Sequence, residues 1–208
     1  MSGIVGQNTL GGSGLIKSPE GGGAWNFIKK LTASGDSSLS FVDGTDDVVL
    51  DSTYKTYVFT FNNIHAADTS IFTFQANASG GSGFNETITS TMFRAYHIEG
   101  SGASGLGYQT SGDQAQGTSY NQIFFQHIST DNDSSGSGIL HLFDPSNTTF
   151  VKNFIANTMH VNSTGSEGAI HSFSAGYFNT TSAITEIDFK MSSGNIDAGD
   201  ICLYGIST

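Results

Sequence analysis

The side chains best suited to acid–base or metal chemistry in this chain are its six histidines. Their spacing supports neither a catalytic nor a metal-binding role. They are His65, His97, His127, His141, His160 and His171. No two of them form an HxH or HExxH pair, the spacings that bring two imidazoles to one metal ion. Four of them fall in stretches that predict β-strands, where a half-buried histidine bonded to a hydroxyl or backbone group is the ordinary case. The histidines therefore predict no metal site.

The loop that begins at Asp131 has the start of a calcium-binding pattern. Asp131, Asp133 and Ser135 place oxygen atoms at its first, third and fifth positions, and Gly136 stands at the sixth. The twelfth position is Leu142, where such loops need a bidentate acid. Asp131 and Asp133 are the candidate metal ligands, and a polar hairpin loop without metal is the favoured interpretation.

No pattern for nucleophilic or hydrolytic catalysis is present. There is no GxSxG turn, and the Gly-rich segments 80–83 and 101–105 lie between predicted strands rather than at a phosphate-holding strand-to-helix turn. No pair of carboxylates is brought together by the pattern. Cys202 is the only cysteine, so no intrachain disulfide can form, and its apolar neighbours predict a buried, inert thiol. We expect no enzyme activity, no catalytic residue and no cofactor.

Alternation of aromatic and other residues is the dominant pattern from Ala24 onward, and it is typical of half-buried strands. Strands are predicted at 25–28, 38–42, 48–50, 57–61, 71–76, 91–98, 121–128, 139–143, 149–155, 169–178, 184–191 and 201–206. Turn-rich clusters separate them at 43–46, 80–83, 101–107, 131–138 and 192–195. No interval has the i, i+3, i+4, i+7 spacing of an amphipathic helix. The fold class is therefore all-β, an antiparallel β-sandwich of jelly-roll-like type with an extended N-terminal arm.

The stretch 184–191 shows the alternation most cleanly. Its apolar positions are Ile187, Phe189 and Met191, and its charged positions are Glu186, Asp188 and Lys190. Since successive side chains of a strand point to opposite faces, the apolar set is predicted to pack inward and the charged set to meet water.

Residues 1–23 differ from the rest of the chain and predict an extended docking arm. They are rich in glycine and contain isolated apolar residues, which suit a peptide that becomes ordered on another subunit. These candidate virion-docking residues are Ile4, Val5, Leu10, Leu15 and Ile16. The segment lacks the features of a secretory signal, and no stretch approaches the ~18 apolar residues of a membrane span. Residues 24–208 are predicted to form one β-sandwich head domain, and no membrane partner is expected.

The charge balance excludes nucleic acid as an expected partner. The chain has 18 acidic against 7 basic residues and a net charge of −11, whereas phosphate binding needs clustered lysine and arginine. The adjacent pair Lys29 and Lys30 is interpreted as part of a solvated strand edge. Charged residues make up only 12% of the chain, so its polar surface is mostly neutral Ser, Thr, Asn and Gly.

Several segments resemble a group of small structural proteins of tailed phages, notably marine ones, known as tail fibre or capsid-associated proteins. The segments are SGIVGQN at 2–8, AWNFIKKLTAS at 24–34, DSTYKTYVFTFNNI at 51–64, SGILHLFDPSNTTF at 137–150, AGYFNTTSAI at 175–184 and FKMSSGNIDAGDICLYGI at 189–206. The resemblance spans nearly the whole chain and implies a virion structural role without catalytic residues. It does not indicate where on the particle the protein lies.

We expect a capsid decoration, or cement, protein that is assembled in the host cytoplasm and displayed on the virion surface. In this interpretation the arm docks onto the major capsid protein and the head projects outward as part of a homotrimer, because virion β-sandwich heads commonly occupy threefold positions. The alternative is a tail fibre or receptor-binding module whose arm anchors to a tail component. Its loops 101–118 and 131–138 would contact host glycan or protein. A carbohydrate-active enzyme on the same fold would need a cleft with converging carboxylates, which the sequence does not predict.

Overall fold

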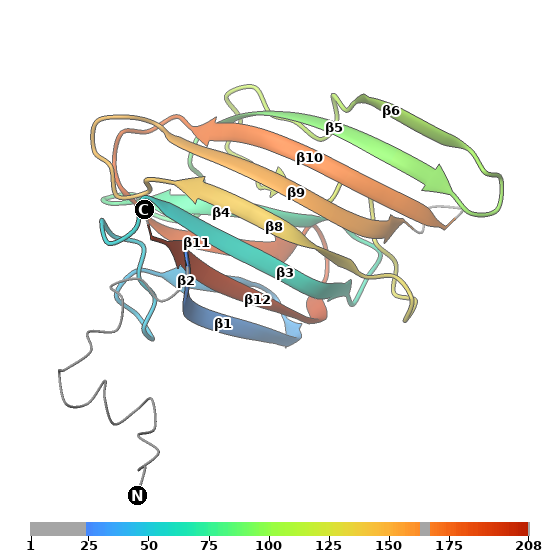
Figure 1. Ribbon diagram of the computed structural model, residues 1–208, viewed down its shortest axis with the longest axis horizontal. Coiled ribbons are helices and arrows are strands. Elements are labelled where there is room, and N and C mark those ends of the chain that lie inside the picture. Colours follow the sequence, from blue (N-terminus) through green and yellow to red (C-terminus); the bar gives the residue numbers. More distant parts are fainter. Residues whose placement is uncertain (1–23, 163–166, 208) are drawn as a thin grey trace, which may run out of the picture.

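The computed structural model describes residues 24–162 and 167–207 as two antiparallel β-sheets packed face to face (Figure 1). The strands are β1 (Trp25–Asp36), β2 (Leu39–Val42), β3 (Thr56–Ala66), β4 (Phe72–Ala78), β5 (Ile88–Ile98), β6 (Ser104–Tyr108), β7 (Asn121–Gln122), β8 (Gly136–Phe143), β9 (Lys152–Asn162), β10 (Gly168–Phe178), β11 (Ile184–Met191) and β12 (Ile196–Ile206). No helix occurs within these described ranges. The predicted all-β sandwich is therefore confirmed, whereas the predicted arm at 1–23 lies outside the described residues.

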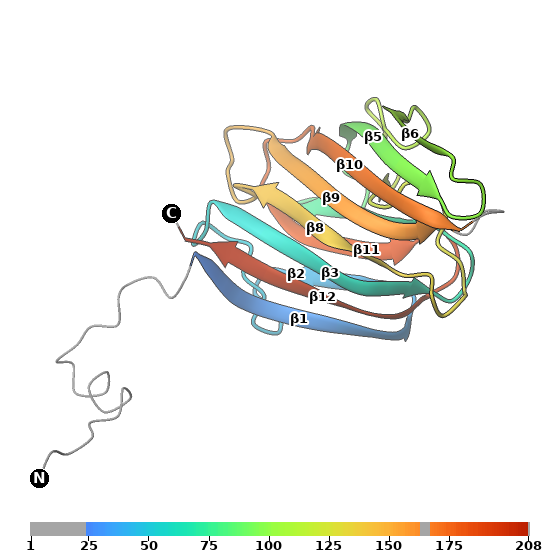
Figure 2. The same cartoon turned by 45° about the vertical axis from the view of Figure 1, so that its right-hand side comes forward.

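The two sheets differ in size. The larger has eight strands in the order β1-β12-β3-β8-β9-β10-β5-β6, and the smaller has four in the order β2-β11-β4-β7. Figure 2 shows the larger sheet as a broad twisted layer in front of the smaller one. The small sheet covers only part of the inner side of the large one. Loops rather than strands therefore cover the inner side near β5 and β6.

Phenylalanine side chains fill the space between the sheets. Phe189 of β11 is fully buried and packs its ring against five other buried rings. These rings are Phe41, Phe59, Phe61, Phe72 and Phe74. Full burial of one such side chain contributes roughly 2–3 kcal/mol, and most of these contacts have the edge-to-face or tilted geometry that aromatic pairs prefer. The inward set predicted for 184–191 is confirmed, since Ile187, Phe189 and Met191 are all buried.

The outward set of β11 is only partly wet, which corrects the expectation for Asp188. Its side chain points away from the core, yet the residue is 2% exposed because Tyr120 and Ser40 cover it. The Tyr120 hydroxyl donates to Oδ2 at 2.8 Å, and the Ser40 hydroxyl donates to Oδ1 at 2.5 Å. The loop that contains Tyr120 thus covers part of the β11 face that the sequence predicted to meet water.

Three sequence predictions of strands and turns were wrong. Residues 48–50 form a loop, because Val48 and Leu50 direct their N–H groups to Thr45 and Asp43 of the preceding turn rather than to a neighbouring strand. The expected turn at 101–107 contains β6, in which Gly105 leaves room for the ring of Tyr96, only 2.9 Å from where a Cβ would stand. The segment 121–128 forms a strand only at Asn121–Gln122.

Candidate functional site

The inner side of the large sheet is polar where β5, β9 and β10 meet. Ser172 accepts the N–H of Phe125 at 3.1 Å, and Thr158 donates to the carbonyl of Ile123 at 2.9 Å. Both hydroxyls are buried and bind the irregular segment that follows β7. The N–H groups of Ile123 and Phe124 both donate to the carbonyl of Phe72, and side-chain hydroxyls supply the partners of the Ile123 carbonyl and the Phe125 N–H.

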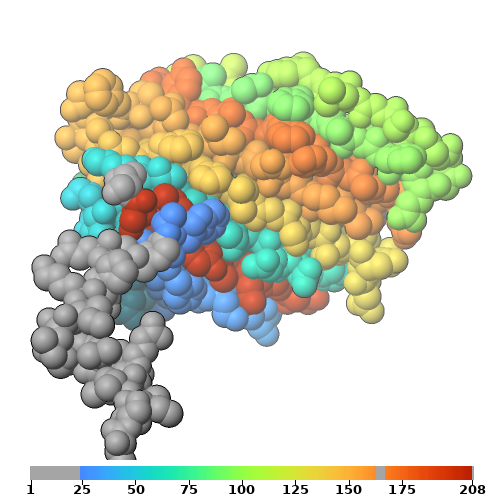
Figure 3. All heavy atoms as spheres, in the orientation of Figure 1, coloured from blue at the N-terminus to red at the C-terminus, as the bar shows by residue number. Residues whose placement is uncertain are grey.

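The outer side of the same strands is apolar. Its large side chains are Phe93 on β5, Leu106 and Tyr108 on β6, Ile155 and Met159 on β9, and Phe173 on β10. Apart from Phe173, which is half-buried, they are between 42% and 73% exposed. Phe93 and Phe173 are register partners and stack with ring centroids 4.7 Å apart. We call these six residues the apolar sheet face, and Figure 3 shows the side of the molecule on which they lie.

Polar and apolar side chains are mixed on both sides of these strands, although Phe154 and Ala156 of β9 belong to the core. Ile155 and Met159 of β9 are about half exposed, whereas Thr158 and His160 of the same strand are buried. A sheet normally turns its apolar side inward. Contiguous exposed apolar side chains on a soluble domain indicate an interaction site, so the apolar sheet face is the candidate docking surface.

Charged side chains are confined to the β1 and β12 margin of this outer face. Strands β3, β6, β8 and β10 contain no Lys, Arg, Asp or Glu, and the charged residues of β5 and β9, Arg94 and Lys152, lie inward. At the margin, Lys30 lies 3.3 Å from Asp200. The hydrogen bond from Thr32, helped by Lys30, lowers the pKa of Asp200 below its ordinary value. Beside this pair, Trp25 and Phe27 pack edge-on against Tyr204 and extend the aromatic surface.

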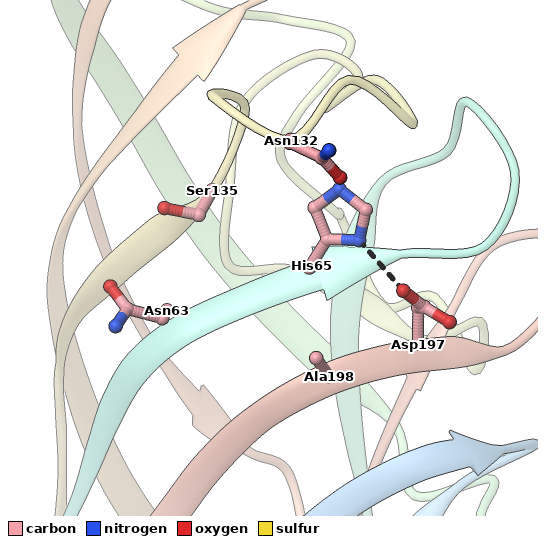
Figure 4. Close-up of a pocket in the computed structure, with 6 residues that line it drawn as sticks. All are labelled: Asn63, His65, Asn132, Ser135, Asp197 and Ala198. Carbon is pink, nitrogen blue, oxygen red and sulfur yellow. Dashed lines mark hydrogen bonds and ion pairs between the residues drawn. The ribbon is translucent and has the colours of Figure 1, made fainter.

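A polar pocket of about 440 Å³ lies at one end of the same sheet (Figure 4). It is lined by Asn63 and His65 of β3, Asp197 and Ala198 of β12, and Asn132 and Ser135 of the loop before β8. Irregular registers shape it, because β3 and β12 both contain bulges here. Gly199 fits this bulge with a φ of 122°, since a Cβ would lie 2.8 Å from the carbonyl oxygen of Asn63.

His65 holds the wall of this pocket together. Its Nδ1 lies 3.1 Å from the Asp197 carboxylate, and its Nε2 lies 3.1 Å from the backbone carbonyl of Asp131. Both ring nitrogens therefore face hydrogen-bond acceptors of the protein itself, and neither faces a serine, threonine or cysteine side chain of the described residues. The His–Asp pair therefore joins β3, β12 and the 131–135 loop, and it lacks the geometry of a catalytic dyad.

The predicted metal ligands border this pocket. The Asp131 carboxylate accepts a hydrogen bond from Ser129 at 3.1 Å, and its carbonyl accepts the N–H of Ser134 at 2.9 Å. Asp133 is exposed at the tip of the same loop. Within 24–162 and 167–207, no three His, Cys, Asp or Glu side chains gather as a metal-binding group. The sequence pattern of the loop is thus the only support for Asp131 and Asp133 as metal ligands.

Buried ionisable side chains lie under the apolar sheet face. His160 is fully buried, its ring stacks on Phe124, and neither ring nitrogen has a hydrogen-bond partner among the described residues. Burial lowers the pKa of His160 to about 3, although the nearby backbone of Phe125 slightly favours the charged ring. Arg94 is stacked between the rings of Tyr96 and Phe125, and its guanidinium also donates to Gln126. His160 lies in the interior and cannot contact a partner directly, whereas Arg94 is partly exposed on the inner side of β5.

The other predicted residues are scattered. His171 lies on the outer side of β10 with Nε2 2.5 Å from Asn157, His97 is exposed on β5, and Cys202 is buried and free. The docking residues predicted at positions 4 to 16 lie outside the described residues. Sequence reasoning missed the apolar sheet face, because alternation along 152–162 separates two sets of side chains without showing which set is inside.

Comparison of the chain with protein-family models, with curated proteins and with solved structures gave no match. Nor do the described ranges contain a helix of the length and apolarity that a membrane span requires.

Proposed function

We propose that this chain is a non-enzymatic structural protein of a bacteriophage virion, a capsid decoration protein displayed on the particle surface. The observation that carries the proposal is the apolar sheet face, on which large side chains such as Phe93, Ile155 and Met159 are exposed. Such a surface suits a module whose task is to be held against other protein. The segments that resemble tailed-phage structural proteins are the reason for proposing a phage particle as the place of this contact.

The partners of this function are the major capsid protein and further copies of the chain. The net charge of −11 and the absence of charge on the outer side of six neighbouring strands fit protein contacts rather than nucleic acid. A homotrimer assembled in the host cytoplasm is the proposed form, with residues 1–23 docking onto the capsid through Ile4, Val5, Leu10, Leu15 and Ile16.

Deletion of residues 1–20 tests the docking role. The shortened chain is expected to keep the circular dichroism and unfolding midpoint of the full chain, because β1 begins only at Trp25. It is expected to lose binding to purified capsids in a co-sedimentation assay. The matched variant replaces all five apolar residues by serine in the full-length chain, so that the arm keeps its length and loses only its apolar side chains. Undiminished capsid binding by both variants would contradict the docking role.

A tail fibre or receptor-binding module is the second candidate, and the pocket beside His65 favours it. That pocket borders the 131–138 loop and presents the amides of Asn63 and Asn132 beside the Asp197 carboxylate, groups that suit hydroxyl-rich ligands. Copy number separates the candidates. A number near that of the capsid lattice supports decoration, and a few copies per particle support a tail position.

A further inference from the structure

The apolar sheet face has the properties of a contact between identical chains. It is formed by strands β9, β10, β5 and β6, which are neighbours in the large sheet, and the rings of Phe93 and Phe173 stack across two of these strands. We propose that this face binds a second copy of the same chain. The inference rests on the proposed structural function, and it names the partner of that surface.

Charge is the first reason to choose a second copy. Two chains that each have a net charge of −11 repel one another. Across β3, β8, β9, β10, β5 and β6, however, the outer side presents no charged side chain. The acids lie in loops, on the small sheet and at the β1 and β12 margin, and the one that borders the face, Asp113, accepts a hydrogen bond from the hydroxyl of Tyr108. The apolar sheet face is therefore a side on which a second acidic chain can approach closely.

Area is the second reason. The face spans four strands spaced about 4.8 Å apart, roughly 19 Å in width, and seven residues of a strand span roughly 23 Å. It therefore covers on the order of 400 Å², and the uncharged strands β3 and β8 beside it add roughly half as much again. Two copies would together bury on the order of 800 to 1,200 Å², the size of a weak, concentration-dependent interface.

Shape is the third reason. A shallow apolar hollow of about 160 Å³ lies between Thr91, Phe93, Ile155, Phe173 and Ala175. Projecting side chains stand on the same face at its border, among them Leu106, which is 73% exposed, and Met159, which is 46% exposed. A hollow and projecting side chains on one face can fit a second copy, either face to face in a dimer or against a different surface of the neighbour in a closed trimer.

Polarity inside the sheet is an independent indication. The inner hydroxyls of Ser172 and Thr158 bind the 123–125 backbone, and the core side chains of these strands, such as Phe154, lie on the inner side. The apolar side chains of the outer side therefore have no packing partner within the described chain other than one another. Association of two faces would give Phe93, Ile155 and Met159 the burial that the single chain leaves incomplete.

Analytical ultracentrifugation of the full chain tests the inference. The wild-type protein is expected to sediment as two or three chains of 21.8 kDa at micromolar concentration. Ile155→Lys places an ammonium group at the centre of the face and is expected to raise the dissociation constant at least a hundredfold. Leu106→Lys is a second variant, because its highly exposed side chain can be replaced without disturbing the fold. The matched control is Ser193→Lys, in the exposed turn between β11 and β12.

The outcomes separate this inference from the proposed function. A wild-type chain that stays monomeric at high micromolar concentration would overturn the inference, as would association that both lysine variants on the face retain. Loss of association in Ser193→Lys would also overturn it, since the effect would then follow from added charge. Absence of the chain from purified particles would instead refute the virion role, and it would leave self-association through this face standing.

Discussion

Acid is predicted to destabilise this protein through His160. The folded chain holds this ring neutral, with a pKa of about 3, whereas the unfolded chain titrates near the ordinary value of 6.5. The pKa in the folded state is therefore lowered, so the unfolded state binds the proton more tightly at any pH between these values. Stability is unaffected well above pH 6.5, and it falls as the pH decreases toward 3.

The size of the effect follows from the two pKa values. One pKa unit corresponds to 1.36 kcal/mol, so the full loss on reaching about pH 3 is roughly 5 kcal/mol. At about pH 4.5 the loss is roughly 3 kcal/mol, because the unfolded imidazole is almost fully charged there and the buried ring is not. His141, whose pKa burial also lowers, contributes in the same direction.

Urea unfolding at about pH 7 and about pH 4.5 measures the difference directly. In the wild-type chain the free energy of unfolding is expected to fall by about 2 to 3 kcal/mol between these conditions. His160→Phe keeps a ring stacked on Phe124 but cannot take up a proton, so most of this fall should disappear. His97→Phe is the control, because His97 is exposed. An equal fall in wild type and His160→Phe would refute the reasoning.

Two further predictions concern buried polar groups. Thr158→Val keeps the side-chain shape and leaves the carbonyl of Ile123 unpaired, so it should lower the free energy of unfolding by about 1 to 2 kcal/mol. Thr91→Val, at an exposed position of β5, should change it by less than about 0.5 kcal/mol, and equal losses in urea titrations would contradict the proposed hydroxyl contact. Lys152 is fully buried and donates to the carbonyls of Phe150 and Thr180 at 2.7 and 3.3 Å. Lys152→Met should therefore cost about 1 to 3 kcal/mol, and a variant as stable as wild type would show that these carbonyls find other donors.

The sequence predicted the fold class because alternation is a local property. The inward set of β11 could be read directly, since Ile187, Phe189 and Met191 differ sharply from their charged neighbours. In β9 both sets mix apolar and polar residues, so the pattern could not show that Ile155 lies outside and His160 inside. Only the packing of the 123–125 segment decides that orientation.

The polar pocket could not be predicted for a different reason. His65 and Asp197 are 132 positions apart in the sequence, and they meet because β3 and β12 are neighbours with displaced register. Bulges are set by tertiary contacts as much as by local residues. The loop at Asp131 was recognised from its pattern, but its contact with His65 depends on the strand order.

A cryo-electron microscopy map of the intact particle, with this chain placed in it, tests the central claim most directly. The account predicts many copies on the capsid surface, with the apolar sheet face around Phe93, Ile155 and Phe173 buried against a neighbouring copy. A particle without this chain, or one in which that face points into solvent, would contradict the account.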